Sequence, residues 1–373
     1  MPWHEVSVME QREEFVRLAS LEGANRRELC RRFGISPDTG YRWLRRWEEE
    51  GSVAEHSRRP RHSPNQTAPA LERRIKALRD MHPAWGARKL VANLARKNVV
   101  MPAASTVHAI LRRNDKVLET AGQGVALTRF EKAAPNQLWQ MDYKGWVKLL
   151  DGSRLHPLTI IDDHSRYLIG LKACAGQTDE IVRDHLEAVF RHHGLPEAMF
   201  VDNGPPWGGG PGQRWTRFGV WLLKLGVRVL HSRPYHPQSR GKNERLHRTL
   251  NQEVLSLRCF RDLAEAGEAF DAWLPIYNEQ RPHEALGMAV PADRYRPSPR
   301  PMPARLMEPE YDEGEITRKV GTTKAYIRFK GRSWPVGQAF FGERVAIRPR
   351  GGDGQFGIFF GAHQISEIDL AMS

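Results

Sequence analysis

Cysteine is scarce in this chain, and long apolar runs are absent. The three cysteines, Cys30, Cys174 and Cys259, lie far apart, so we expect neither a disulfide framework nor a CxxC zinc pair. Free thiols in a reducing cytoplasm are the simpler expectation. The lack of a long apolar run argues against a membrane span, and the acidic, amphipathic first residues do not resemble a signal peptide.

Positive charge, by contrast, is plentiful. The formal net charge is +13, and most of the excess of Lys and Arg over Asp and Glu lies in residues 1–130. A basic segment of this size predicts a nucleic-acid partner, because cations that neutralise phosphates release counterions. An acidic protein partner is the alternative. We expect a cytoplasmic protein associated with the nucleoid and with no membrane partner.

The length of 373 residues predicts more than one domain, at roughly 150 residues each. Residues 1–50 are expected to form three short helices, with Asn25 as a cap, a turn at Gly34 and Ser36-Pro37 opening the third. This is a helix-turn-helix pattern, although a plain helical bundle is possible. In the third helix we expect Tyr41, Trp43, Leu44 and Trp47 to pack, and the candidate DNA contacts are Thr39, Arg42, Arg45 and Arg46.

A linker is expected over residues 51–69, where proline, serine and arginine occur without periodicity. Its arginines Arg58, Arg59 and Arg61 could follow a DNA groove or stay solvated. Residues 70–115 repeat the helical pattern and predict a second helix-turn-helix, with Ser105 as a cap and a basic end at Arg112 and Arg113. Residues 116–131 are expected to be a second linker.

Strands and helices alternate over residues 132–296, which predicts an α/β core. Its first three strands are expected within residues 138–149, 154–165 and 167–174 as an antiparallel meander. A buried strand should end near Asp202, with a helix after it at 213–225 and another basic helix near residue 240. After a proline-rich break, residues 297–373 predict a small β-barrel or sandwich. The predicted fold class is therefore multidomain, with all-α modules, an α/β core and a C-terminal β domain.

Three acids are the candidate catalytic and metal-binding residues: Asp142, Asp202 and Glu244. Clustered carboxylates repel one another unless cations lie among them, and Mg²⁺ prefers oxygen ligands and bridges to phosphate. Two such ions can activate a hydroxyl and stabilise a leaving 3′ oxygen. This accounts for the single acid on a basic helix, where a local salt bridge is the alternative.

Cationic side chains around Glu244 are candidate DNA contacts: Arg240, Lys242, Arg245 and Arg248. For Lys242, simple surface charge is an equal possibility. Asn203, His236 and Gln238 are candidates for orienting the substrate. Asp162 and Asp163 could be taken for metal ligands, but side-chain bonding within a hairpin turn is the favoured interpretation.

Several motifs together carry a family resemblance. They are Trp139 with Asp142, the VDNG of residues 201–204, the HPQSRGKNE of 236–244, the IIDDHSRYLIG of 160–170, and Tyr277-Asn278 with Arg281-Pro282-His283. This set resembles the retroviral-integrase-type catalytic core of DDE transposases, over about residues 132–296. With the two helix-turn-helix modules, the whole chain is most similar to insertion-sequence transposases of the integrase group.

The resemblance implies an RNase H-like core with two Mg²⁺ or Mn²⁺ ions held by Asp142, Asp202 and Glu244. It also implies a DNA transposase that binds terminal inverted repeats, frees 3′ hydroxyls and joins them to target DNA as a dimer or larger homo-oligomer. A catalytically inactive DNA-binding regulator and a nuclease that cuts without joining are the alternatives.

Two departures from the family pattern stand out. The interval between Asp202 and Glu244 is 41 residues, longer than is usual in the group. The excess falls in a glycine-rich stretch at 205–215, interpreted as a tolerated insertion or a loop that closes over DNA. The N-terminus also lacks the zinc module of retroviral integrases, so no structural zinc is implied.

Overall fold

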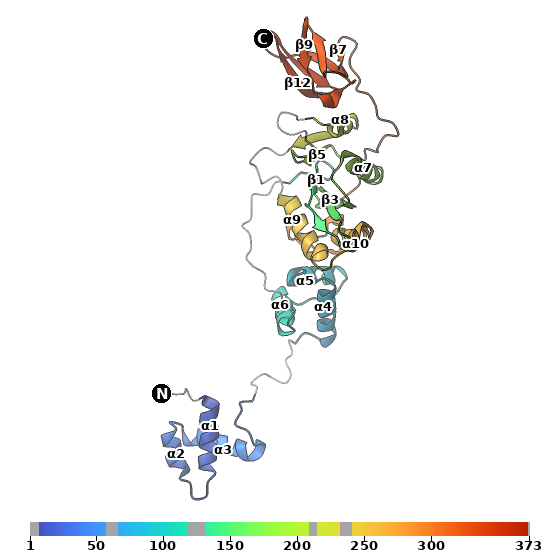
Figure 1. Cartoon of the computed structure of the whole chain (residues 1–373). Helices are drawn as coiled ribbons and strands as arrows, with labels where there is room; N and C mark the ends of the chain where they lie inside the picture. The colour runs from blue at the N-terminus through green and yellow to red at the C-terminus, as the bar shows by residue number, and fades with distance from the viewer. Residues whose placement is uncertain (1–6, 57–65, 118–130, 209–214, 232–240, 372–373) are drawn as a thin grey trace. The chain divides into compact units, whose positions relative to one another are not determined.

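The computed structural model describes residues 7–56, 66–117, 131–208, 215–231 and 241–371 (Figure 1). The chain divides into two compact units, residues 1–67 and 68–373, each with its own core. Among the described residues, none of the helices is long and apolar enough to cross a membrane.

The first unit is the predicted three-helix module, with α1 (Val8–Ala19), α2 (Arg26–Arg32) and α3 (Pro37–Glu50). Asn25 and Ser36 cap α2 and α3 as expected. Of the aromatic residues in α3, Trp43 packs into the core, whereas Tyr41 and Trp47 are each 42% exposed, so the prediction that all of them pack is wrong. Val53, which follows α3, is also buried in this core.

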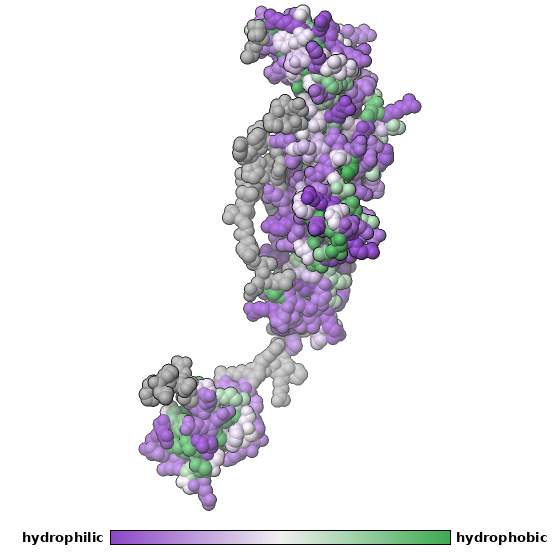
Figure 2. All heavy atoms as spheres, viewed as in Figure 1, coloured by the Kyte–Doolittle hydropathy of each residue, from purple (hydrophilic) through white to green (hydrophobic). Residues whose placement is uncertain are grey.

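The second helical module has α4 (Pro69–Met81), α5 (Ala87–Arg96) and α6 (Ala104–Arg113) around its own buried core. The helix α6 begins after Ala103, and no side chain caps it, so the predicted cap at Ser105 is wrong. Hydrophilic side chains cover much of the visible face of this module (Figure 2). Helix α5 is docked on the central core, where the Asn93 amide donates to the Gln280 carbonyl at 2.7 Å.

A mixed sheet forms the central core. Its strands are β1 (Trp139–Tyr143), β2 (Val147–Lys148), β3 (Arg154–Asp162), β4 (Leu168–Cys174), β5 (Ala198–Val201) and β6 (Arg228–His231). The strands β1, β3 and β4 are antiparallel neighbours, which confirms the predicted meander. The strand β1 then pairs in parallel with β5, and β5 with β6. The first predicted strand is split in two near Gly145, whose φ is 100°, a conformation that favours glycine.

Helices cover both faces of this sheet. Trp139 and Met141 pack with α7 (Asp179–His193) and α8 (Arg217–Lys224) in one core. Ile161 and Leu168 pack with α9 (Gly241–Leu250) and α10 (Leu263–Pro275) in the other. The π-helical segments η2 (Asn251–Leu255) and η3 (Ile276–Gln280) extend α9 and α10. Because side chains alternate along a strand, Gln140 and Asp142 of β1 point toward α9.

The C-terminal region forms two small sheets. A four-stranded antiparallel sheet has the order β12-β11-β10-β7, and β8 (Tyr326–Phe329) pairs with β9 (Arg332–Pro335). The strands of the four-stranded sheet are β7 (Ile316–Lys319), β10 (Arg344–Pro349), β11 (Gln355–Phe360) and β12 (His363–Asp369). The sheet does not close in the part of the chain that the structure describes, so the predicted all-β region is present without a closed barrel. Its core includes Val220 and Leu223 of α8.

Two helical glycines should respond oppositely to the same substitution. A Cβ on Gly40 in α3 would lie 2.5 Å from the Cys30 sulfur and 2.9 Å from the Phe15 ring, whereas one on Gly267 in α10 would meet nothing within 4 Å. We expect Gly40→Ala to destabilise the first unit by about 1–3 kcal/mol. Gly267→Ala should stabilise α10 by roughly 0.5–1 kcal/mol. Hydrogen exchange of α3 and α10 amides in the full chain measures both, and equal effects would contradict the packing.

Candidate active site

The register of the sheet relates two of the three candidate acids. In the parallel pair β1–β5, Trp139 lies opposite Met199 and Gln140 opposite Phe200. Continuing this register by two residues brings Asp142 level with Asp202, which directly follows β5. Side-chain alternation assigns both acids to the face that α9 covers, since their neighbours Met141 and Val201 belong to the opposite core. Both residues are partly buried.

Helix α9 lies against the same place on the sheet (Figure 1). The Thr159 hydroxyl, opposite Asp142 in β3, donates to the Asp142 carbonyl at 3.0 Å. The same hydroxyl lies 2.9 Å from Nε2 of His247 in α9. Glu244 is three residues before His247, and hence about 4.5 Å back along the helix axis and within about 60° of the same side. Its side chain is exposed.

The donor set is chemically suited to a hard cation, because two aspartates at one level of a sheet offer the oxygen ligands that Mg²⁺ prefers. The Asp202 side chain also accepts from the Gly204 amide at 2.9 Å, which orients one of its oxygens. Over the described ranges, however, no three His, Cys, Asp or Glu side chains are grouped closely enough to hold a metal ion. A complete three-acid site therefore remains a prediction.

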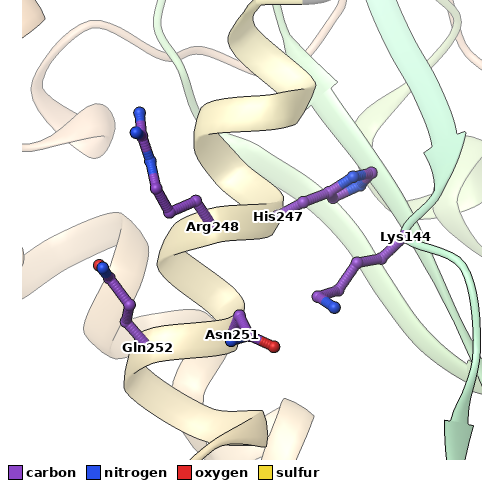
Figure 3. A pocket seen from close by; sticks show the side chains of 5 residues that line it. All are labelled: Lys144, His247, Arg248, Asn251 and Gln252. Carbon is purple, nitrogen blue, oxygen red and sulfur yellow. The ribbon is translucent and has the colours of Figure 1, made fainter. Parts of the chain in front are cut away.

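A cationic hollow of about 460 Å³ lies where β1 ends, and one of its lining residues is two positions beyond Asp142. It is lined by Lys144, His247, Arg248, Asn251 and Gln252, from the end of β1 and from α9 with η2 (Figure 3). In the close-up, Lys144 extends from the strand toward Asn251. Sequence reasoning found Arg248 but missed Lys144. The sequence signal for Lys144 was its position two residues after Asp142, just beyond the end of β1.

Lys242 is not a surface cation. Its side chain is 16% exposed and forms an ion pair with Asp163, which is fully buried. The two adjacent aspartates also differ from each other. Asp162 accepts from the Ser165 amide and hydroxyl at 2.7 and 2.6 Å, which confirms the predicted turn bonding. Asp163 instead bonds to residues far away in the sequence.

The other candidate DNA contacts fall into two groups. Arg42, Arg45, Arg112, Arg245 and Arg248 are exposed, although Arg245 lies 3.5 Å from Glu284. Three residues have partners inside their own modules: the Thr39 hydroxyl is 2.9 Å from Ser36, Arg46 donates to the Ala54 carbonyl at 2.9 Å, and Arg113 pairs with Glu72.

Asn203 is exposed directly after Asp202, where it can reach a substrate. Six predicted residues lie outside the described ranges, namely Arg58, Arg59, Arg61, His236, Gln238 and Arg240.

Aromatic contacts hold the two described ends of the glycine-rich stretch. Trp207 is 2% exposed and stacks on Tyr143, the residue after Asp142, with ring centroids 5.7 Å apart. Trp215 donates its indole N–H to the Ile365 carbonyl at 3.3 Å in the C-terminal sheet. The residues flanking this insertion therefore connect the neighbourhood of the acids with the C-terminal domain.

Comparisons with known families agree with this architecture. Residues 132–237 and 225–291 match the integrase core domain, and residues 315–373 match the C-terminal domain of IS481 family transposases. Residues 11–61 match a helix-turn-helix domain, and residues 39–111 match a homeodomain-like domain. The protein thus combines helix-turn-helix modules with an integrase-type core.

Two proteins of insertion elements are similar to this chain. An uncharacterized 31.7 kDa protein of insertion element IS407 from Burkholderia multivorans is 29% identical over 46% of this chain and 60% of its own length. An uncharacterized 39.2 kDa protein of insertion element IS476 from Xanthomonas euvesicatoria is 25% identical over 62% of this chain and 67% of its own length. With the IS481 match, they show that the chain is similar to insertion-sequence proteins and has an integrase-type core.

Among solved structures, the simian T-cell lymphotropic virus intasome in complex with PP2A regulatory subunit B56 gamma has a TM-score of 0.40 to this chain. It is 16% identical and covers 80% of this chain and 96% of its own. A likeness of this size adds nothing to what the register and the contacts show.

Acid should destabilise the fold through His247. Burial, and secondarily the charge of Lys144, lowers the pKa of His247 to about 4. Its contribution to stability is complete above about pH 6.5 and is lost as the pH falls toward 4, by at most about 3 kcal/mol, because the unfolded chain binds the proton first. His247→Gln should flatten this part of the curve of unfolding free energy in urea against pH. His185 and His193, whose pKa values burial also lowers to about 4, remain in both proteins, and unchanged curves would contradict the assignment.

Arg112 and Arg113 offer a matched test of DNA contact in α6. Arg112→Gln should weaken binding to element-end DNA and reduce the slope of log K against log salt by about one, because one phosphate contact is lost. Arg113→Gln should change that slope much less, because Arg113 already pairs with Glu72. Fluorescence anisotropy over a salt series measures both slopes. Equal losses would mean that the ion pair opens when DNA binds.

Proposed function

We propose that this protein is a DNA transposase. It would bind the terminal inverted repeats of its mobile element, cleave the ends to expose 3′ hydroxyls and join them to target DNA by metal-dependent transesterification. The observation that carries the proposal is the register that brings Asp142 level with Asp202, beneath a helix that carries Glu244. The integrase-core and IS481 matches support the same reaction class.

In this proposal Asp142, Asp202 and Glu244 are the catalytic carboxylates and would hold one or two divalent ions, Mg²⁺ or Mn²⁺. When bound, such ions supply charge stabilisation for the attacking and leaving oxygens. Glu244 would have to approach the two aspartates once DNA is present. Catalytic contacts are often longer in the unliganded protein than in the reacting complex, so the exposed position of Glu244 is compatible with this role.

The cationic hollow gives the DNA strand a place to lie. Lys144 and Arg248 line it together with the amides of Asn251 and Gln252, and such groups bind phosphate oxygens. Burial lowers the pKa of His247, so its ring is neutral at neutral pH and can exchange hydrogen bonds without adding charge. The hollow would thereby hold a phosphate beside the acids.

The other parts of the chain would serve end recognition and assembly. The modules at 1–50 and 70–115 would read the repeats, the RNase H-like core at 132–296 would carry out the chemistry, and the region at 297–373 would contact DNA or a second protomer. Because two ends must be joined together, we propose a dimer or larger homo-oligomer. It would act in the cytoplasm, at the nucleoid.

The decisive substitution is Glu244→Gln, which removes a charge from the site with little change in shape. Joining of labelled element ends to target DNA should fall at least about 100-fold, as expected when electrostatic stabilisation of the transition state is lost, while end binding is retained. Glu268→Gln, at an exposed acid of α10, is the matched control and should join ends at the wild-type rate.

Other outcomes separate the rival functions. Equal joining by wild type and Glu244→Gln would make Glu244 a surface acid and remove it from the site. Tight binding by the wild type with neither cleavage nor joining would favour the inactive regulator. Cleaved ends without joined products would favour a nuclease.

A further inference from the structure

A buried carboxylate lies beside the candidate site and takes no part in the chemistry proposed above. Asp163 follows β3 and is completely buried. It accepts from the Lys132 amide and from the Gln140 side-chain amide, both at 2.8 Å, and forms an ion pair with Lys242. Its own amide donates to the Leu138 carbonyl at 2.9 Å. Each of its oxygens therefore has a donor, and its backbone is fixed to β1.

Two of these partners each lie two residues before a candidate acid in the sequence. Gln140 precedes Asp142 by two residues in β1, and Lys242 precedes Glu244 by two residues in α9. One carboxylate thus ties together the two elements that carry the first and third acids, although they are about one hundred residues apart in the sequence.

Helix α9 has a second attachment, to a residue of β3. There, His247 meets Thr159, which bonds to the Asp142 carbonyl. From Lys242 to His247 the helix rises about 7.5 Å, so two separated contacts anchor α9, one at Asp163, which follows β3, and one at Thr159 within β3. Glu244 lies between the anchors, and two separated attachments fix both the position and the rotation of a helix.

Lys242 can hold this position because its charge is compensated where it lies. An ammonium group removed from water is costly unless it is paired and hydrogen-bonded, and Asp163 is its buried counter-charge. The Lys242 ammonium also lies 3.2 Å from the Asp163 carbonyl. The ammonium group of Lys242 is thus engaged with a buried carboxylate, whereas the sequence offered DNA contact or simple surface charge as its two alternatives.

We propose that Asp163 and Lys242 are positioning residues, whose buried ion pair sets where α9 presents Glu244 relative to Asp142. The inference rests on the proposed function for its catalytic consequence, but the attachment of α9 is a property of the fold. Without the pair, the described contacts of α9 that remain, including those of His247, Arg245 and the apolar side chains, all lie C-terminal to Glu244, so its first turns can shift. The carboxylate of Glu244 would then be displaced from the place where a divalent ion has to be held.

The test compares lysines in similar surroundings. Lys242→Met removes the charge and retains the length, and Lys242→Arg retains the charge. Lys224→Met is the matched control, because Lys224 of α8 is 13% exposed and pairs with Glu308 and Glu343, each at 2.9 Å. Asp163→Asn removes the other partner. Two quantities are measured in the full-length protein: the rate of end joining as a function of Mg²⁺ concentration, and hydrogen exchange of the amides of residues 245–250.

We expect Lys242→Met and Asp163→Asn to slow joining about 10- to 100-fold at limiting Mg²⁺, the usual effect of losing a group that orients a metal ligand. Part of the rate should return at higher Mg²⁺ and in Lys242→Arg. The double variant should be no slower than either single one, because both remove the same interaction. Amides of α9 should exchange faster in these variants, and those of Lys224→Met should be unchanged.

The proposal is overturned if Lys242→Met slows joining no more than Lys224→Met does and the exchange of α9 amides stays at the wild-type rate. A wild-type protein that joins no ends would count against the proposed function alone. In that case faster exchange of α9 in both Lys242→Met and Asp163→Asn would still support the attachment, and unchanged exchange would refute it.

Discussion

The parallel pairing of β1 with β5 is the constraint on which the rest of this architecture depends. It fixes which residues of two distant segments share a level, and alternation along β1 then sends Trp139 and Met141 into one core and Gln140 and Asp142 toward α9. A slip of one residue in β1 would exchange these faces, and it would bury the acid among Phe190 and Val182. The large apolar side chains of β1 therefore specify the position of the acid.

Burial separates the structural acids from the candidate catalytic ones. Asp162 and Asp163 are fully buried, and donors from the protein occupy their oxygens. Burial raises the pKa of Asp162, and its hydrogen bonds oppose that shift. Asp142 and Asp202 lie instead at the partly exposed end of the strands, where a cation and a phosphate can reach them. Exposure at the end of a strand therefore distinguishes the candidate catalytic acids from the buried ones.

Local patterns predicted most of the elements, because caps and periodicity are short-range features. Ser36 and Pro37 start α3 where the sequence places it, and the meander follows its apolar runs. The failures involve contacts between distant residues. Nothing near Lys242 in the sequence identifies Asp163 as its partner, and nothing near Val53 shows that it completes the first core. Local sequence patterns likewise do not predict the strand register that aligns Asp142 with Asp202, although the family motifs include both acids.

The second helical module shows how recognition can be coupled to chemistry. Its helix α5 faces the core through the buried Asn93 amide and a two-bond pair of Arg96 with Asp293. The exposed ion pair alone contributes little, but a buried amide that loses its acceptor costs about 1–3 kcal/mol, so the contact has a preferred geometry. Docking through α5 leaves Arg112 of α6 exposed. In the proposed function, a base sequence bound by α6 would therefore lie at a fixed distance from Asp142. That distance would set the position at which the DNA is cut.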